Sequence, residues 1–83
     1  MKLSDELIKK LGKIYEPSAM INMEFKGKDL AVKTDEEGRP ILLFIGELTS
    51  AGTIKGERYA RRLAFDREGK LIKDHWELKG KSS

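Results

Sequence analysis

The residues that could do acid–base chemistry centre on one histidine, His75, which stands between Asp74 and Trp76. An imidazole acts as a general base when a carboxylate orients it. Neighbouring residues of a strand point to opposite faces of a sheet, so Asp74 does not orient His75, and the predicted cross-strand neighbour Arg61 would repel a proton on the ring. We therefore interpret His75 as a partly exposed, cross-strand polar residue.

The sequence also lacks the residue motifs that other catalytic and metal-binding sites require. The chain has no cysteine, which excludes thiol catalysis, cysteine-ligated zinc and iron–sulfur clusters. No nucleophilic-serine motif surrounds any serine, and the glycines between Gly46 and Gly56 lack the Gly-Lys-Ser/Thr sequence of a phosphate loop. The acidic runs at 5–6 and 35–37 are explained by a helix start and a turn. We predict a protein that is not an enzyme and has no cofactor, no metal and no identified small-molecule ligand.

The net positive charge is concentrated in the second half of the chain. Residues 1–40 hold eight Lys or Arg and eight Asp or Glu, whereas residues 41–83 hold nine and six, so the net charge of +3 lies in the second half. Cations interleaved with aromatic rings on a sheet are typical of proteins that bind single-stranded nucleic acid. The alternative is an ion-paired outer hairpin, with Arg62 facing Asp74. The candidates for nucleic-acid binding are Lys55, Arg58, Tyr59, Arg61, Arg62 and Trp76.

The elements that must position these side chains begin with a helix. Apolar residues at Leu3, Leu7, Leu11 and Ile14 follow the helical period, and Ser4 is a good N-cap. Because Pro17 disfavours helix at the residue before it, the spacing predicts an amphipathic helix over residues 3–16. Such a helix is too short to be stable alone, so its apolar stripe must pack on another element.

From residue 20 the apolar period changes to two, and glycine-containing turns separate the segments. We predict a single small domain over residues 1–83, with antiparallel strands over 20–79 and a frayed polar tail over 80–83. The predicted fold class is α+β: an N-terminal amphipathic helix packed on a meander of about five antiparallel strands, with a sheet that could be strongly curled.

Two predicted turns have the same Asp-x-x-Gly pattern, Asp35-Glu36-Glu37-Gly38 and Asp66-Arg67-Glu68-Gly69. Asp at the first position and Gly at the fourth are typical of three-residue hairpin loops, so a common turn solution explains the similarity more simply than a duplication does. If residue 35 lies opposite 39, residues 30 and 32 face 44 and 42. If residue 66 lies opposite 70, residue 60 faces 76 and residue 62 faces 74.

The segment 41–45 is apolar at every position, and a strand with two apolar faces must be covered twice. One predicted helix covers only one face. Either the sheet closes into a small barrel, or the second face meets another subunit. We favour a binding or assembly domain that forms a homodimer through an apolar sheet face, whose candidate residues are Ile41, Leu43 and Ile45.

No apolar run approaches the length of about 20 residues that spans a bilayer, and no signal-peptide core is present. With no cysteine, the expected location is cytoplasmic and no membrane partner is expected.

Overall fold

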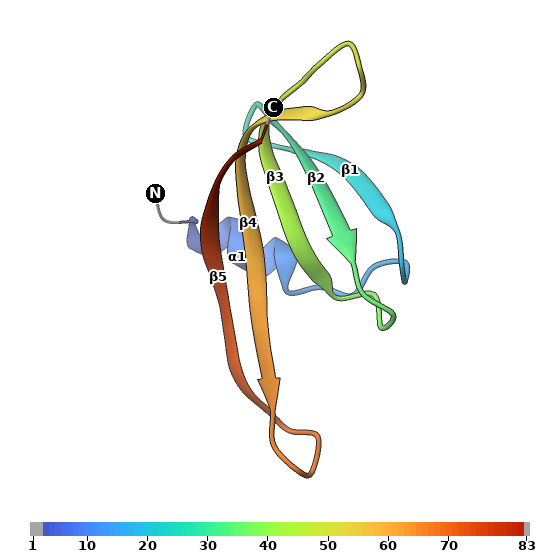
Figure 1. Cartoon of the computed structure of the whole chain (residues 1–83), viewed down its shortest axis with the longest axis vertical. Coiled ribbons are helices and arrows are strands. Elements are labelled where there is room, and N and C mark those ends of the chain that lie inside the picture. Colours follow the sequence, from blue (N-terminus) through green and yellow to red (C-terminus); the bar gives the residue numbers. More distant parts are fainter. Residues whose placement is uncertain (1–2, 83) are drawn as a thin grey trace.

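The computed structural model describes residues 3–82 and places one short helix against a five-stranded antiparallel sheet (Figure 1). The strands follow one another in space in chain order, and the first and last strands do not pair, so the sheet is not closed. This confirms the predicted α+β fold and leaves β1 and β5 as the two sheet edges. The elements are α1 (Asp5–Leu11), β1 (Met20–Phe25), β2 (Lys28–Thr34), β3 (Pro40–Leu48), β4 (Ile54–Phe65) and β5 (Leu71–Ser82).

The helix begins at Asp5, directly after the predicted N-cap Ser4 and two residues later than the predicted range, and it ends five residues earlier than predicted. The Ser4 hydroxyl accepts a hydrogen bond from the Leu7 backbone N–H, as expected of an N-cap. The helix ends at Leu11, followed by Gly12, rather than at residue 16. Glycine has low helix propensity, and the residues beyond it make hydrogen bonds to the sheet instead. Ile14, which was predicted to lie on the buried stripe, is 66% exposed.

The segment after the helix is attached to the turn between β2 and β3. The Tyr15 N–H donates to the Gly38 carbonyl oxygen at 2.8 Å, and the Ser18 N–H donates to the Asp35 carbonyl oxygen at 2.8 Å. These backbone hydrogen bonds compete with continuation of the helix, which explains why the predicted helix extends beyond the observed end at Leu11.

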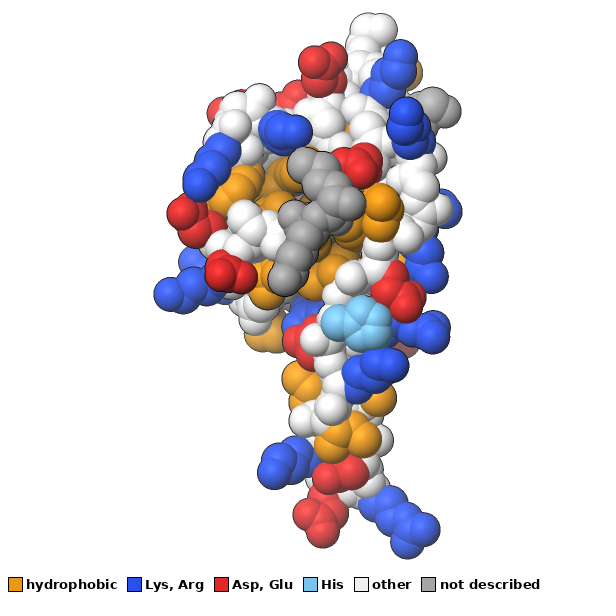
Figure 2. Space-filling model, turned by 90° about the vertical axis from the view of Figure 1, so that its left-hand side faces the viewer, with side chains coloured by type: hydrophobic (Ala, Val, Ile, Leu, Met, Phe, Trp, Pro, Cys, Tyr) orange, Lys and Arg blue, Asp and Glu red, His pale blue; other side chains and the backbone are white. Residues whose placement is uncertain are grey.

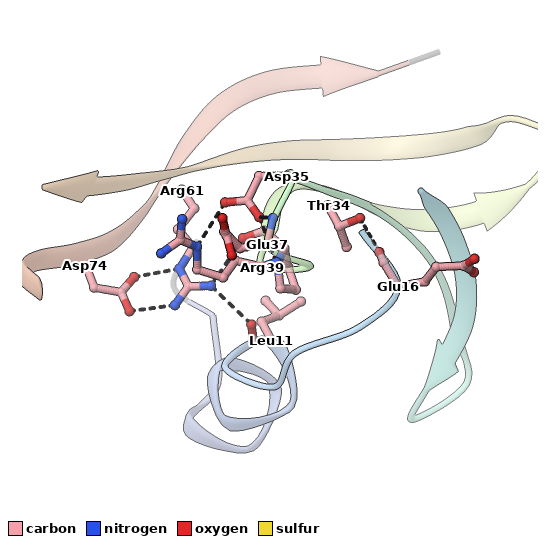
Figure 3. A network of polar contacts seen from close by, with 9 residues as sticks. Leu11, Glu16, Thr34, Asp35, Glu37, Arg39, Arg61 and Asp74 are labelled. Carbon is pink, nitrogen blue, oxygen red and sulfur yellow. Dashed lines mark hydrogen bonds and ion pairs between the residues drawn. The ribbon is translucent and has the colours of Figure 1, made fainter. Parts of the chain in front are cut away.

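Thr34 holds the same segment from inside the protein. Its side chain is 2% exposed, and its hydroxyl donates to the Glu16 carbonyl oxygen at 2.6 Å while accepting from the Ala19 N–H at 2.9 Å (Figure 3). A buried hydroxyl is stable only when it is hydrogen-bonded, and here both its donor and its acceptor capacity are used.

The β2–β3 pairing differs from the predicted register by one residue. Thr34 pairs with Pro40 as the turn requires, but Lys33 pairs with Leu42, so Ile41 is the extra residue of a β-bulge. Because side chains alternate along a strand, this single insertion exchanges the two faces of β3. Val32 therefore faces Leu43, not Leu42 as predicted.

The core lies between α1 and the sheet face that contains Leu43, which we call the helix face. Leucines from the helix meet aliphatic residues of β2 and β3 and the ring of Tyr59 from β4. Four further side chains pack around this cluster at its margin. The buried cluster is Leu3, Leu7, Leu11, Leu30, Val32, Leu43 and Tyr59, and the margin is Met23, Phe25, Ile45 and Trp76.

The second hairpin repeats the bulge. Phe65 pairs with Leu71 as predicted, but Ala64 pairs with Lys73, so Ile72 is the extra residue, in the same position after the turn as Ile41. Every later predicted pair is displaced: Trp76 faces Arg61 rather than Ala60. The second bulge of β5 places Lys79 outside the pairing.

The predicted frayed tail over 80–83 is wrong as far as the structure describes it. Residues 80, 81 and 82 continue β5 and pair with residues 58, 57 and 56 of β4. Residue 83 lies outside the described residues. With this extension β5 has 12 residues, the same length as β4. At the other end of the two strands, the turn of their hairpin projects beyond the rest of the sheet (Figure 1).

The opposite side of the sheet, which we call the far face, is covered in part by the chain itself. Gly46 of β3 pairs with Gly56 of β4. A Cβ atom on Gly56 would lie 2.0 Å from the Ile45 carbonyl oxygen, so the close approach of the two strands requires glycine. Beyond the glycine pair, at the tip of the β3–β4 hairpin, Ile54 is 5% exposed and lines a small hollow together with Ala31 and Phe44.

Gly38→Ala should destabilise the protein more than Gly69→Ala. Both glycines occupy the same turn position, with φ of +84° and +83°, and alanine in that region costs about 1–2 kcal/mol. A Cβ on Gly38 would also lie 2.2 Å from the Tyr15 carbonyl oxygen, whereas one on Gly69 meets nothing within 4 Å. Urea unfolding should give Gly38→Ala at least about twice the loss of unfolding free energy of Gly69→Ala. Equal losses would contradict the proposed attachment of the segment after the helix.

Candidate functional site

The residues predicted to form a self-association face do not form one. Leu43 is fully buried beneath the helix, and Ile45 packs against the same core. Ile41 is half-buried at the bulge. The physical reason is the bulge, which turns Leu43 toward the helix and leaves Leu42 and Phe44 on the far face.

The structure also divides the predicted nucleic-acid residues. Tyr59 is 2% exposed in the core, and Arg61 and Trp76 face each other on the helix face. Arg58 and Arg62 have exposed side chains on the far face. Lys55 is exposed near the tip of the β3–β4 hairpin, beyond the glycine pair. The six residues therefore do not form one continuous surface.

Arg61 is a structural residue. Its side chain is 8% exposed, and its guanidinium donates two hydrogen bonds of 2.7 Å to the two carboxylate oxygens of Asp74 (Figure 3). The same group reaches the Leu11 carbonyl oxygen at 3.4 Å and the Pro40 carbonyl oxygen at 3.2 Å, and lies 5.8 Å from the Trp76 ring centre. It thus joins β4, β5, the end of α1 and the start of β3.

Two carboxylates of β5 are held in their ionised form by these contacts. The hydrogen bonds from Arg61 lower the pKa of Asp74 despite its partial burial. On the far face, hydrogen bonds from Lys79 and His75 lower the pKa of Glu77, and the charge of Arg62 adds to the effect. Glu77 lies 3.2 Å from the Lys79 ammonium, 3.4 Å from His75 and 3.6 Å from Arg62.

β5 has one edge paired with β4, and no other strand within residues 3–82 pairs with its second edge. Its length of 12 residues is twice that of β1, the other edge strand. The strand also carries large apolar side chains that remain exposed: Leu71 at 44%, Ile72 at 64% and Leu78 at 45%. A long edge of unpaired backbone groups with apolar side chains is a template for pairing with another strand.

An open groove of about 640 Å³ runs beside this edge, between α1 and β5. Leu78 and Trp76 line it from the strand, and Ile8, 42% exposed, lines it from the helix. Figure 2 views the molecule from this side, with His75 in pale blue among basic and acidic side chains. The groove also includes the polar side chains of Arg61, Asp74 and His75.

The sequence reasoning missed this edge, although a signal for it was present. In a meander that does not close, the last strand is necessarily an edge, and the apolar residues 71, 72 and 78 lie on that strand. The frayed-tail prediction and the displaced register concealed the length of the strand and the exposure of its side chains.

Comparison of the chain with protein-family models, curated proteins and solved structures finds no match. Among residues 3–82, no group of three or more His, Cys, Asp or Glu is arranged to hold a metal ion. In the same part of the chain, α1 is far shorter than a helix that crosses a bilayer, and no candidate membrane-spanning helix is found.

The Arg61–Asp74 pair should make stability depend on acid pH. Because the folded-state pKa of Asp74 is below its ordinary value of 3.8, the pair stabilises the fold above that pH, and the stabilisation is lost as the pH falls through the lowered pKa. Asp74→Asn should therefore be less stable than wild type at pH 7, and the difference should shrink below about pH 4. Urea unfolding from pH 7 to pH 2 measures this. The exposed Glu36→Gln variant is the control, and an unchanged Asp74→Asn difference across this range would contradict the assignment.

Proposed function

We propose that this chain is a non-enzymatic interaction domain that self-associates by adding a strand to the open edge of β5. The observation that carries the proposal is the length of that edge together with the exposed apolar residues Leu71, Ile72 and Leu78. The proposal keeps the homodimer expected from the sequence and transfers it from the face of β3 to the edge of the sheet.

Features of β5 restrict which strands can pair with it. Bulges at Ile72 and Lys79 interrupt the strand and leave a regular segment over residues 73–78. Bulges and lysines at a sheet edge discourage indiscriminate pairing. The edge therefore suits one specific partner strand rather than general aggregation. This supports an assembly function over the alternative that the exposed apolar side chains of β5 have no binding role.

A double substitution in the edge strand should abolish self-association. Wild type is expected to be a dimer at tens of micromolar by light scattering, and Ile72→Lys with Leu78→Lys should be a folded monomer, because charge replaces the exposed apolar side chains of the edge. The matched control is Ile14→Lys with Leu48→Lys, whose side chains are 66% and 50% exposed away from β5. A monomeric wild type, or a control that also becomes monomeric, would contradict the proposal.

A second candidate function is binding of single-stranded nucleic acid by the far face of β4 and β5. It is favoured by exposed cations at Arg58, Arg62, Lys73 and Lys79, which outnumber the single carboxylate of these two strands, Glu77, on the described part of that face. Phosphate groups are bound by such clusters in a salt-dependent manner. The aromatic residues Tyr59 and Trp76 lie on the helix face and would not stack bases there.

Under this second function, a fluorescent single-stranded oligonucleotide should show an anisotropy increase at low salt that falls steeply as salt is added. Arg58→Ala with Arg62→Ala should reduce the salt slope by about 1–2, because two phosphate contacts are removed. Lys9→Ala with Lys13→Ala on the opposite side removes equal charge and is the control. Absence of any anisotropy change at low salt would exclude the second function.

A further inference from the structure

We propose that the strand added to β5 is β5 of a second copy of this chain, in an antiparallel ladder centred on His75. This inference rests on the proposed function and deepens it by naming the register. The result would be a closed two-fold dimer with a continuous ten-stranded sheet.

Symmetry limits the registers that are available. Residues opposite each other in an antiparallel ladder point to the same face, and a two-fold axis perpendicular to the sheet relates the two copies. Within 73–78, residues 73, 75 and 77 point to the far face, and residues 74, 76 and 78 point to the helix face. One residue must therefore face its own copy on the axis.

The charges and the bulges of β5 distinguish among these registers. An axis at Lys73 would place two ammonium groups opposite each other, and an axis at Leu78 would carry the ladder across the bulge at Lys79, outside the regular segment. An axis at Asp74 or at Glu77 would place two like carboxylates opposite each other. An axis at Trp76 would place Lys73 opposite Lys79 twice, once on each side of the axis. An axis at His75 places Lys73 opposite the second copy's Glu77, which gives two pairs of opposite charge and no directly opposed acidic pair.

The apolar side chains agree with the same axis. In the register centred on His75, residue 72 of each copy lies opposite residue 78 of the other. Ile72 and Leu78 are 64% and 45% exposed in the single chain, and Leu78 borders the groove that contains Ile8. The ladder would bury these side chains twice, once at each end of the regular segment.

The local polar contacts are compatible with this arrangement. Glu77 already lies within 4 Å of Lys79, Arg62 and His75, all on exposed side chains, so Lys73 of the second copy would join an existing ion-pair cluster. On the helix face, Asp74 would lie opposite Trp76 of the second copy and remain paired with Arg61.

The other edge strand does not offer an equivalent partner. β1 has 6 residues, and a β1–β5 contact between copies would be heterologous. Such contacts repeat without closing unless the rotation forms a ring, so they would produce larger assemblies. Light scattering separates a dimer from these assemblies.

Cysteine cross-linking tests the register, because the chain has no cysteine of its own. The His75 side chain is 45% exposed, so His75→Cys should fold normally. Under mild oxidation it should form a disulfide-linked dimer about 100-fold faster than Glu36→Cys, because pairing raises the effective thiol concentration from about tens of micromolar to the millimolar range. A mixture of Lys73→Cys and Glu77→Cys should form the mixed disulfide in preference to either self-linked dimer.

The outcomes separate the register from the proposed function. Rapid cross-linking of His75→Cys, together with the mixed disulfide, supports the His75 axis. A dimer by light scattering in which His75→Cys links no faster than Glu36→Cys overturns the register while the proposed function stands. A dimer in which His75→Cys instead links to Glu77→Cys places the axis at Trp76. Monomers at tens of micromolar overturn both.

Discussion

The β2–β3 turn is the constraint on which the rest of the structure depends. The Asp35 carboxylate accepts hydrogen bonds from the Glu37 and Arg39 N–H groups and from the Arg39 guanidinium. Burial opposes ionisation of Asp35, but these hydrogen bonds outweigh it and lower its pKa. The turn fixes the bulge at Ile41, and that bulge turns Leu43 into the core.

The same turn also determines what the helix covers. The Gly38 and Asp35 carbonyl oxygens accept hydrogen bonds from the segment after the helix, so α1 is held over the start of β3. Arg61 then connects the end of α1 to β4 and β5 through two carbonyl oxygens and Asp74. A short helix and a few polar contacts thus organise one face of the sheet, and the second edge of β5 has no partner strand within residues 3–82.

The repeated Asp-x-x-Gly turn connects fold and function. In both hairpins the bulge lies three residues after the glycine of the turn, at Ile41 and at Ile72. In the first hairpin the bulge selects the core face. In the second, it limits the regular part of an edge strand and leaves Ile72 exposed. One local geometry therefore serves packing in the interior and selectivity at the edge.

The amino-acid sequence by itself determined the element types, their order and the N-cap at Ser4, because periodicity, capping and turn chemistry are local properties. It did not determine the register or the end of the helix. The hydrogen bond from Tyr15 to Gly38 joins residues distant in the chain, and the turn sequence does not by itself show whether a bulge follows it. Only the tertiary structure decided which side of β3 is buried and that β5 remains an open edge, because a one-residue shift exchanges faces without changing any local signal.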